Sequence, residues 1–269
     1  MLLSESEIEK PRPSNLARII ACPGSRRLVA LAPPKKSSTW ADAGTAAHYI
    51  GEQCLSIGRA PFEYFGQQVT VNGAAYKVDA DVVVAVSKYI HHVRTFERAL
   101  GQGAQRFVEK KLWLPEIDNG GMVDCLLAGV EDRRAHIQVH DYKHGQGVYV
   151  SEAWNAQFLA YGIAGAYFLY PGVPLTEHKF TFAVHQPRFA DTKPCRAQTL
   201  SGADVDRWRV ETLLPALEAG KNPDAPLRSG PHCQFCGAKD ICVEYLSAPK
   251  ARFGYVPLKA EPVPTNFQF

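Results

Sequence analysis

The chain has 269 residues, of which 46% are hydrophobic and 21% are charged, and its formal net charge is +3. This composition is typical of a soluble globular protein, and the length is sufficient for one large domain with a full core. No apolar run reaches the ~18 residues of a membrane span, and residues 1–13 lack the apolar segment of a signal peptide. We therefore expect a cytoplasmic protein with no membrane partner, in which the seven cysteines favour metal binding over disulfides.

Basic residues gather near the N-terminus. Such a segment can follow DNA phosphates, and a solvated surface is the alternative interpretation. The basic residues in question are Lys10, Arg12, Arg18, Arg26, Arg27, Lys35 and Lys36.

The N-terminal part, residues 14–60, is predicted to be helical. Ser14 suits the N-cap of a first helix, which should end at Pro23-Gly24. A second helix is expected over residues 42–55. Together these segments would form a helical addition to the core that follows.

The core is predicted over residues 78–186. Apolar residues recur every three or four positions over residues 82–100, which indicates an amphipathic helix ended by Gly101. Strands are expected over residues 106–114, 122–130 and 135–142, then a helix over 152–169 and a strand over 178–185. The order helix, three-stranded meander, helix, strand predicts an α/β fold whose last strand joins by a crossover.

The C-terminal part is expected to hold one helix, over residues 203–219, and a cysteine cluster within residues 201–245. We interpret residues 1–245 as one domain and residues 246–269, which are rich in proline, as a flexible tail.

Two acidic residues of the predicted strands indicate a metal site. Asp141 and Lys143 point to the same face of their strand, because side chains alternate. Asp124 would lie close to Asp141 if the two strands pair. Two converging carboxylates suit Mg²⁺ or Mn²⁺, and a nearby ammonium can stabilise charge that develops on a phosphate. A surface ion pair at the end of a strand is the alternative.

Four short motifs occur in a fixed order along the chain: Gly44 to His48, Gly121 to Asp124, Asp141-Tyr142-Lys143, and Gln157 to Tyr161. Their order resembles the GxxxH, GxxD, (D/E)xK and QxxxY series of the RecB-like branch of the PD-(D/E)xK nucleases. The resemblance spans about residues 14–245 and implies a restriction-endonuclease-like core.

The resemblance also implies a role for each residue of the motifs. His48, Asp124, Asp141 and the backbone carbonyl of Tyr142 would hold Mg²⁺ or Mn²⁺, and Lys143 would be the catalytic lysine. Two residues on one face of the following helix, Gln157 and Tyr161, would bind DNA or support the site. Glu109 is a candidate additional acid, and an ion pair with Lys110 or Lys111 is its alternative.

The cysteines suggest a second metal centre. Cys233, Cys236 and Cys242 have ligand spacing, and they require a fourth ligand. Cys22 is the natural candidate, since RecB-like nucleases with an iron–sulfur staple carry one cysteine before the nuclease motifs and three after them. A [4Fe–4S] cluster on these four residues is therefore expected, and a zinc ion held with His232 in place of Cys22 is the alternative.

The remaining three cysteines lie outside this pattern. Cys54 and Cys125 are expected to be buried small residues, and Cys195 has no assigned role.

These features predict a metal-dependent DNA exonuclease or end-processing nuclease that hydrolyses phosphodiester bonds. The sequence has no phosphate-binding loop of a helicase motor, so the chain would act alone or with a separate partner. Its resemblance to phage recombination exonucleases implies work in recombination or repair, in the host cytoplasm if the protein is phage-encoded. A single-strand annealing protein is then an expected partner. Oligomeric state stays open, as do two alternatives: a structure-specific endonuclease and a non-catalytic DNA-binding protein with a zinc or iron–sulfur site.

Overall fold

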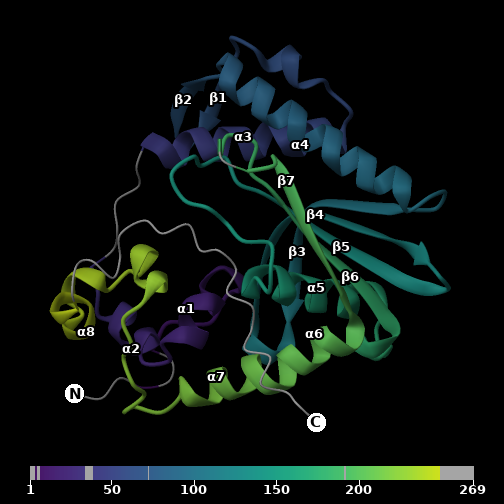
Figure 1. Cartoon of the computed structure of the whole chain (residues 1–269). Coiled ribbons are helices and arrows are strands. Elements are labelled where there is room, and N and C mark those ends of the chain that lie inside the picture. The colour runs from purple at the N-terminus through teal and green to yellow at the C-terminus, as the bar shows by residue number, and fades with distance from the viewer. Residues whose placement is uncertain (1–3, 5–6, 34–38, 72, 191, 249–269) are drawn as a thin grey trace.

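The computed structural model describes residues 4, 7–33, 39–71, 73–190 and 192–248. The chain folds into a mixed α/β structure around one five-stranded sheet, with a small separate hairpin (Figure 1). The helices are α1 (Leu16–Ala21), α2 (Ser25–Ala30), α3 (Thr39–Ser56), α4 (Ala80–Ala99), α5 (Ala156–Leu169), α6 (Gly202–Trp208), α7 (Leu214–Ala219) and α8 (Val243–Ser247). The strands are β1 (Gln68–Val71), β2 (Ala74–Lys77), β3 (Gln105–Leu114), β4 (Asn119–Glu131), β5 (Arg134–Tyr142), β6 (His178–His185) and β7 (Cys195–Ser201).

The large sheet has the strand order β3-β4-β5-β6-β7. The pairs β3–β4, β4–β5 and β6–β7 are antiparallel, whereas β5 and β6 are parallel and α5 connects them. The turn between β4 and β5 has positive φ at Asp132 (51°) and Arg133 (64°), as tight two-residue hairpins require. The predicted meander and the crossover strand are both confirmed.

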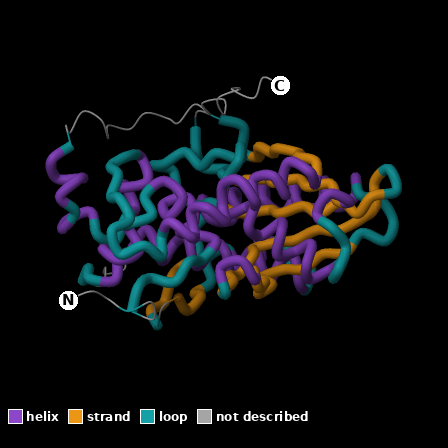
Figure 2. Tube along the Cα trace, turned by 90° about the horizontal axis from the view of Figure 1, so that it is seen from below, coloured by secondary structure: helices purple, strands orange, loops and turns teal. Residues whose placement is uncertain are grey.

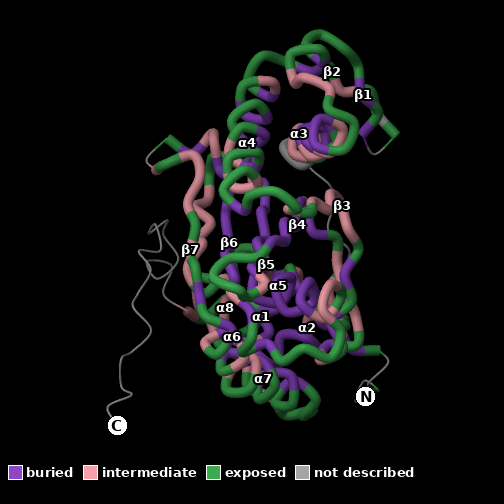
Figure 3. The backbone as a smooth tube through the Cα atoms, turned by 90° about the vertical axis from the view of Figure 1, so that its right-hand side faces the viewer, coloured by how far each residue is buried: buried purple, intermediate pink, exposed green. Residues whose placement is uncertain are grey.

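Helices cover the two faces of this sheet, and each face has its own apolar cluster. Successive residues of β4 alternate between them: Leu126 packs with α5, while Cys125 and Leu127 pack with α3 and α4. Figures 1 and 3 show α3, α4 and the β1–β2 hairpin together on one side of the sheet. The helices α1, α2, α6 and α7 lie on the other side. The sheet is therefore buried on both faces, as the apolar runs of its strands require.

The two ends of the described chain lie together. Figure 2 shows most of the large sheet toward one end of the molecule and short helices with long loops toward the other. At that helical end, α1 contacts both α7 and the short helical turn Pro231–Phe235, which carries Cys233. The N-terminal and C-terminal cysteines are thereby brought into one region.

Several predicted boundaries need correction. Ser14 lies within a short helical turn, Pro13–Asn15, and Asn15 is the N-cap of α1. The helix after β5 begins at Ala156 rather than at Glu152, because the Asn155 side chain accepts a hydrogen bond from the Gln157 backbone and caps it there.

The sequence analysis also missed five elements, namely α2, the hairpin strands β1 and β2, the edge strand β7 and the short C-terminal helix α8. The core therefore extends beyond residue 186 to the end of β7 at Ser201. The predicted helix over residues 203–219 is confirmed as α6 and α7, joined by a π-helical segment, Arg209–Leu213. Residues 246 and 247 complete α8, so the predicted flexible tail does not begin at 246. The rest of that tail, from residue 249, lies outside the described residues.

Candidate active site and cysteine centre

The acidic site lies where two strands of the sheet separate. Pairing of β4 with β5 ends at Cys125 and His140, while β4 continues to pair with β3. The next residues on the two separating strands are Asp124 and Asp141. The Asp124 side chain bridges the gap, because its Oδ2 accepts a hydrogen bond from the Tyr142 backbone N–H at 2.7 Å. Both acids are thus placed by strand register.

His48 reaches the same point from α3. Its Nδ1 lies 3.5 Å from Oδ2 of Asp124, and its ring meets the edge of the Tyr142 ring at a centroid distance of 5.4 Å. The structure therefore brings the residue of the first motif to the residues of the second and third motifs. About a third of the His48 side chain (34%) is exposed, which leaves the site open on this side.

Glu109 joins the site through an unusual backbone conformation. It lies in the middle of β3 with φ of 45°, a region that non-glycine residues seldom adopt, and the β3–β4 pairing skips it. Such a conformation costs about 1–3 kcal/mol and persists only where the surroundings impose it. The pairs on either side, Val108↔Cys125 and Lys110↔Val123, set Glu109 across from Asp124. Ligand atoms of Glu109, His48 and Asp124 all lie within 4.8 Å of one another. The structure thus places this candidate acid at the site, rather than in an ion pair with a neighbouring lysine.

Asp141 and Lys143 form an ion pair on the same side of β5. The Lys143 Nζ lies 2.6 Å from Oδ2 of Asp141, whose side chain is only 4% exposed. The other carboxylate oxygen, Oδ1, accepts a hydrogen bond from Nε2 of Gln157 at 3.3 Å. Lys143 and Gln157 therefore fix the orientation of Asp141 from opposite ends of the loop between β5 and α5.

Tyr161 supports this arrangement from within α5. It is 5% exposed and hydrogen-bonds to the side chain of Gln157, one helical turn earlier. A Cβ atom on Gly121 would lie 2.6 Å from the Tyr161 hydroxyl, so only glycine at that position leaves room for it. The glycine of the second motif and the tyrosine of the fourth are therefore in contact. This burial favours a supporting role for Tyr161 over direct binding of DNA.

The site carries more negative charge than its surroundings can stabilise. Burial raises the pKa of Glu109 to about 7, and repulsion from Asp124, Glu52 and Asp141 adds to the increase. Burial also raises the pKa of Asp141 to about 6, although the Lys143 ammonium opposes the increase. Burial opposes the charge of Lys143, but the carboxylates of Asp141 and Asp124 outweigh it and raise the pKa of the lysine. Crowded carboxylates whose protonation is favoured in this way are the electrostatic environment that a divalent cation relieves.

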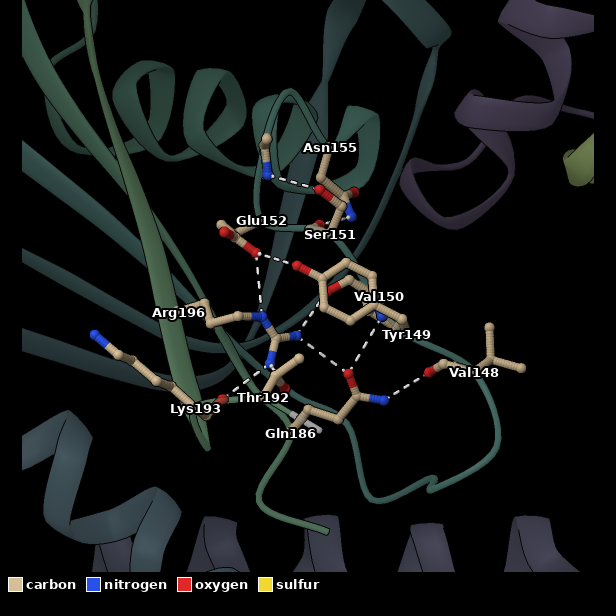
Figure 4. A network of polar contacts seen from close by, with 11 residues as sticks. Val148, Tyr149, Val150, Ser151, Glu152, Asn155, Gln186, Thr192, Lys193 and Arg196 are labelled. Carbon is tan, nitrogen blue, oxygen red and sulfur yellow. Dashed lines mark hydrogen bonds and ion pairs between the residues drawn. The ribbon is translucent and has the colours of Figure 1, made fainter. Parts of the chain in front are cut away.

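The loop between Lys143 and α5 is fixed by residues that the sequence analysis did not identify. Figure 4 shows Arg196, on β7, and Gln186, just after β6, reaching into this loop. Arg196 donates to the Val150 carbonyl at 2.8 Å and to Glu152 at 3.2 Å, and Gln186 donates to the Val148 carbonyl at 2.6 Å. This network holds the segment that separates Lys143 from Gln157. No sequence signal marked it, because β7 was not predicted.

A second centre contains the four cysteines of the predicted staple. Cys22 comes from the end of α1, and the other three come from the C-terminal segment, yet all four line one cavity. All four are buried. Backbone N–H groups point at two of the sulfur atoms: Arg228 donates to Cys22 at 3.2 Å, and Gly230 donates to Cys233 at 3.4 Å. The bond from Gly230 favours the thiolate of Cys233, but burial outweighs it and raises the pKa of this thiol.

The spacing of these sulfur atoms bears on the metal that they would hold. Among the described residues, the four cysteines do not form a group in which three ligand atoms lie within 4.8 Å of one another. A tetrahedral zinc with Zn–S bonds of about 2.3 Å would need its sulfur atoms roughly 3.8 Å apart. His232 also lines the cavity, and because its Nε2 donates to the Arg228 carbonyl at 2.9 Å, its Nδ1 keeps the lone pair that a metal ion could bind.

Contacts outside the cysteines also hold this centre together. The Gly24 N–H donates to the Pro226 carbonyl at 3.2 Å, and a Cβ atom on Gly24 would lie 2.3 Å from the Ala225 carbonyl oxygen. Glycine is required here because the two backbones approach closely, not because of φ, which is −63°.

Arginines of the N-terminal segment also form contacts that hold this region together. Arg18 (9% exposed) forms an ion pair with Glu9 and bonds to Ser25, while Arg26 (6% exposed) donates to the Glu9 carbonyl. Arg27 donates to the Lys221 carbonyl at 3.1 Å. The predicted phosphate-binding segment is therefore wrong for Arg18 and Arg26, which are buried and structural. For Arg27, which is only partly buried, it stays a prediction. Lys35 and Lys36 lie outside the described residues.

The remaining cysteines divide into two kinds. Cys54 and Cys125 are fully buried among apolar residues, as predicted. Cys195 is partly buried at the start of β7.

A family model described as a protein of unknown function, DUF2800, matches residues 12–254, so the chain belongs to this family. The match covers both the acidic site and the cysteine centre. No helix among the described residues is long and apolar enough to cross a membrane.

Proposed function

We propose that this protein is a Mg²⁺- or Mn²⁺-dependent deoxyribonuclease with a RecB-like, restriction-endonuclease-like core. The observation that carries the proposal is the convergence of His48, Glu109, Asp124, Asp141 and Lys143 where β4 and β5 separate. These residues come from four different elements. A surface ion pair at a strand end would need only two of them, and it would not justify the strained backbone of Glu109.

The ligand set suits a hard divalent cation. His48, Glu109, Asp124 and Asp141, with the backbone carbonyl of Tyr142, would hold it, since carboxylate and carbonyl oxygens are the preferred ligands of Mg²⁺ and Mn²⁺. When bound, the cation polarises a phosphodiester and lowers the pKa of a water molecule. Asp124 is already oriented for this role by its hydrogen bond from Tyr142 N–H, and Asp141 by Gln157.

Lys143 supplies the positive charge of the protein itself. Its ammonium is held beside Asp141 and stays protonated at neutral pH because the two carboxylates raise its pKa. A charge fixed at this position stabilises the negative charge that develops on a phosphate during hydrolysis, and it can orient the attacking water. We assign Lys143 this catalytic role.

The cysteine centre would hold a [4Fe–4S] cluster on Cys22, Cys233, Cys236 and Cys242. The position of all four cysteines around one cavity and the backbone N–H groups directed at Cys22 and Cys233 support it. Its role is structural: the cluster would tie the first helix to the last, at a distance from the acidic residues along the sheet. The rival is one zinc ion that binds Nδ1 of His232 in place of Cys22, with the bond from Nε2 to the Arg228 carbonyl kept.

The substrate that we propose is DNA, which the protein would degrade from an end during recombination or repair. A single-strand annealing protein, which would take up the exposed strand, is a fitting partner.

The test is to incubate anaerobically purified protein with end-labelled linear DNA and with a closed circle, with and without Mn²⁺. We expect Mn²⁺-dependent loss of the linear DNA alone. Cleavage of the circle would make the protein an endonuclease with the same site.

A pair of matched variants assigns the activity to this site. Asp124→Asn should abolish cleavage, because it removes one anionic ligand and leaves the shape of the side chain almost unchanged. Asp118→Asn, at the exposed turn that precedes β4, should cleave as the wild type does. Equal activity in both variants would refute the nuclease assignment, and DNA binding without any cleavage would favour a non-catalytic DNA-binding protein.

A further inference from the structure

A second group of metal-ligand side chains shares no residue with the two centres described above. It consists of His92 on α4, His185 at the end of β6 and Cys195 at the start of β7. One ligand atom from each of these residues lies within 4.8 Å of the other two. His185 and Cys195 face each other directly across the β6–β7 pair, so the sheet register sets two of the three positions. The helix packed against the strands supplies the third.

A chain of hydrogen bonds fixes the tautomer of His185. Oε1 of Gln138 can only accept, so Nε2 of His140, 3.2 Å away, must carry the proton. The Nδ1 of His140 is then an acceptor for Nε2 of His185 at 3.0 Å. His185 consequently carries its proton on Nε2 and has a free lone pair on Nδ1. A histidine whose second nitrogen donates in this way is the arrangement found behind metal-binding imidazoles.

The remaining ring nitrogens of His185 and His92 lack hydrogen-bond partners among the described residues. These atoms are Nδ1 of His185 and Nδ1 of His92, and both are buried. His185 itself is 0% exposed. A buried polar atom without a partner costs about 1–3 kcal/mol, so native structures seldom retain one without a reason. Two such atoms beside a cysteine require an explanation.

We infer that His92, His185 and Cys195 form a zinc site. Two imidazoles and a thiolate are nitrogen and sulfur ligands that suit Zn²⁺, whereas the carboxylate site suits Mg²⁺ or Mn²⁺. Binding would replace the proton of the Cys195 thiol, which passes to the solvent, and would satisfy both ring nitrogens. The described residues supply three ligands, which leaves the fourth tetrahedral position for a water molecule.

The location of this site indicates what the ion does. It would connect α4 to the end of β6 and to the edge strand β7. The backbone of His185 also accepts a hydrogen bond from the Lys143 N–H at 2.8 Å. The ion would therefore stabilise the strand end against which the backbone of Lys143 rests. This assignment does not depend on nuclease activity.

Metal content and ligand type test the site without any assay of activity. The full chain is reconstituted with Zn²⁺, and its metal content is compared with those of Cys195→Ser, Cys54→Ser and Cys233→Ser. We expect Cys195→Ser to lose about one zinc per chain. Cys54→Ser, which removes a buried thiol elsewhere, should lose none, and Cys233→Ser should retain the zinc that depends on Cys195.

X-ray absorption at the zinc edge identifies the ligands. The Cys195-dependent zinc should show one sulfur at about 2.3 Å and nitrogen or oxygen ligands at about 2.0–2.1 Å, not four sulfur atoms. His92→Gln, at a partly exposed position, repeats the test if Cys195→Ser does not fold, and it should lose the same zinc. Unchanged zinc content in both variants, or a zinc coordinated by sulfur alone, would overturn the inference.

Discussion

The carboxylate site and the cysteine centre are built in different ways, although each gathers residues from distant parts of the sequence. At the carboxylate site, strand register places Asp124 and Asp141 next to Cys125 and His140, the last paired residues of β4 and β5. At the cysteine centre no sheet is involved, and Cys22 meets Cys233 only because α1 packs against the C-terminal segment. Metal at the first site should therefore matter for chemistry, and metal at the second for stability, since binding energy becomes folding energy when the ligands come from separate segments.

The largest expected effect is on catalysis, and it tests the claim that metal at the carboxylate site matters for chemistry. Asp141→Asn should reduce Mn²⁺-dependent cleavage by about 10³-fold or more, which corresponds to about 4 kcal/mol of activation free energy. Lys143→Ala should reduce kcat by about 10²–10³-fold, as loss of a transition-state donor does. Mn²⁺ binding, followed by calorimetry, should be weakened in Asp141→Asn and retained in Lys143→Ala. Neither variant should lose the brown colour that an iron–sulfur cluster at the cysteine centre would give. Loss of folding in both variants would show that the carboxylate site is structural.

The second prediction tests the claim that metal at the cysteine centre matters for stability. Cys22→Ser should lose the brown colour to the same degree as Cys233→Ser, because four ligands hold one cluster. Both variants should also lower the free energy of unfolding by several kcal/mol, on the order of what a structural metal contributes. Urea denaturation under anaerobic conditions measures this change, and Cys54→Ser is the control. A colourless wild type that contains one zinc and tolerates Cys22→Ser would favour the site built with His232.

Substitution of two glycines, one at each centre, tests the same comparison with smaller expected effects. Gly24→Ala should cost several kcal/mol of stability, because its Cβ would lie 2.3 Å from a backbone oxygen that cannot move alone. Gly121→Ala meets only the tip of Tyr161, so we expect about a tenfold to hundredfold loss of activity, as for other residues that orient ligands.

Gly44→Ala is the matched control for both glycine variants. No described atom lies within 4 Å of the position of a Cβ there, and alanine in a helix should raise stability by about 0.5–1 kcal/mol. Thermal melts and cleavage rates distinguish the three variants. If Gly24→Ala proved as stable as Gly44→Ala, the close packing of the chain ends would be refuted.

The sequence predicted the parts of the molecule that follow from short-range patterns. The period of α4 and the β4–β5 turn gave the elements that place Asp124 and Asp141, and the motif order identified His48. The sequence pattern did not predict β7, since residues 195–201 alternate poorly in polarity and lie at the sheet edge.

Features that depend on long-range packing could not be found in this way. Arg18 and Arg26 resembled a basic surface because their burial depends on Glu9 and on the C-terminal segment. The positive φ of Glu109 is likewise imposed by its surroundings and has no signature in the sequence.

The smallest expected effect is a pH dependence that separates the two centres in metal-free protein. Burial raises the pKa of Glu109 from 4.5 to about 7 in the folded state. Because the folded pKa is higher than the unfolded one, the stabilisation is complete below pH 4.5 and is lost as pH rises toward 7. The slope is at most about 1.4 kcal/mol per pH unit, and the partial exposure of Glu109 reduces it. Measured in EDTA, the urea midpoint of the wild type should therefore fall over this range relative to that of Glu109→Gln, while Glu244→Gln, exposed beside the cysteine centre, should follow the wild type. The comparison of variants isolates Glu109, because Asp141, whose pKa is also raised, and the buried histidines, whose pKa values burial lowers, titrate in both proteins. Added Mn²⁺ should reverse the decline, because the cation stabilises the ionised carboxylates that the metal-free fold disfavours. A difference between wild type and Glu109→Gln that does not change with pH would place the excess negative charge elsewhere.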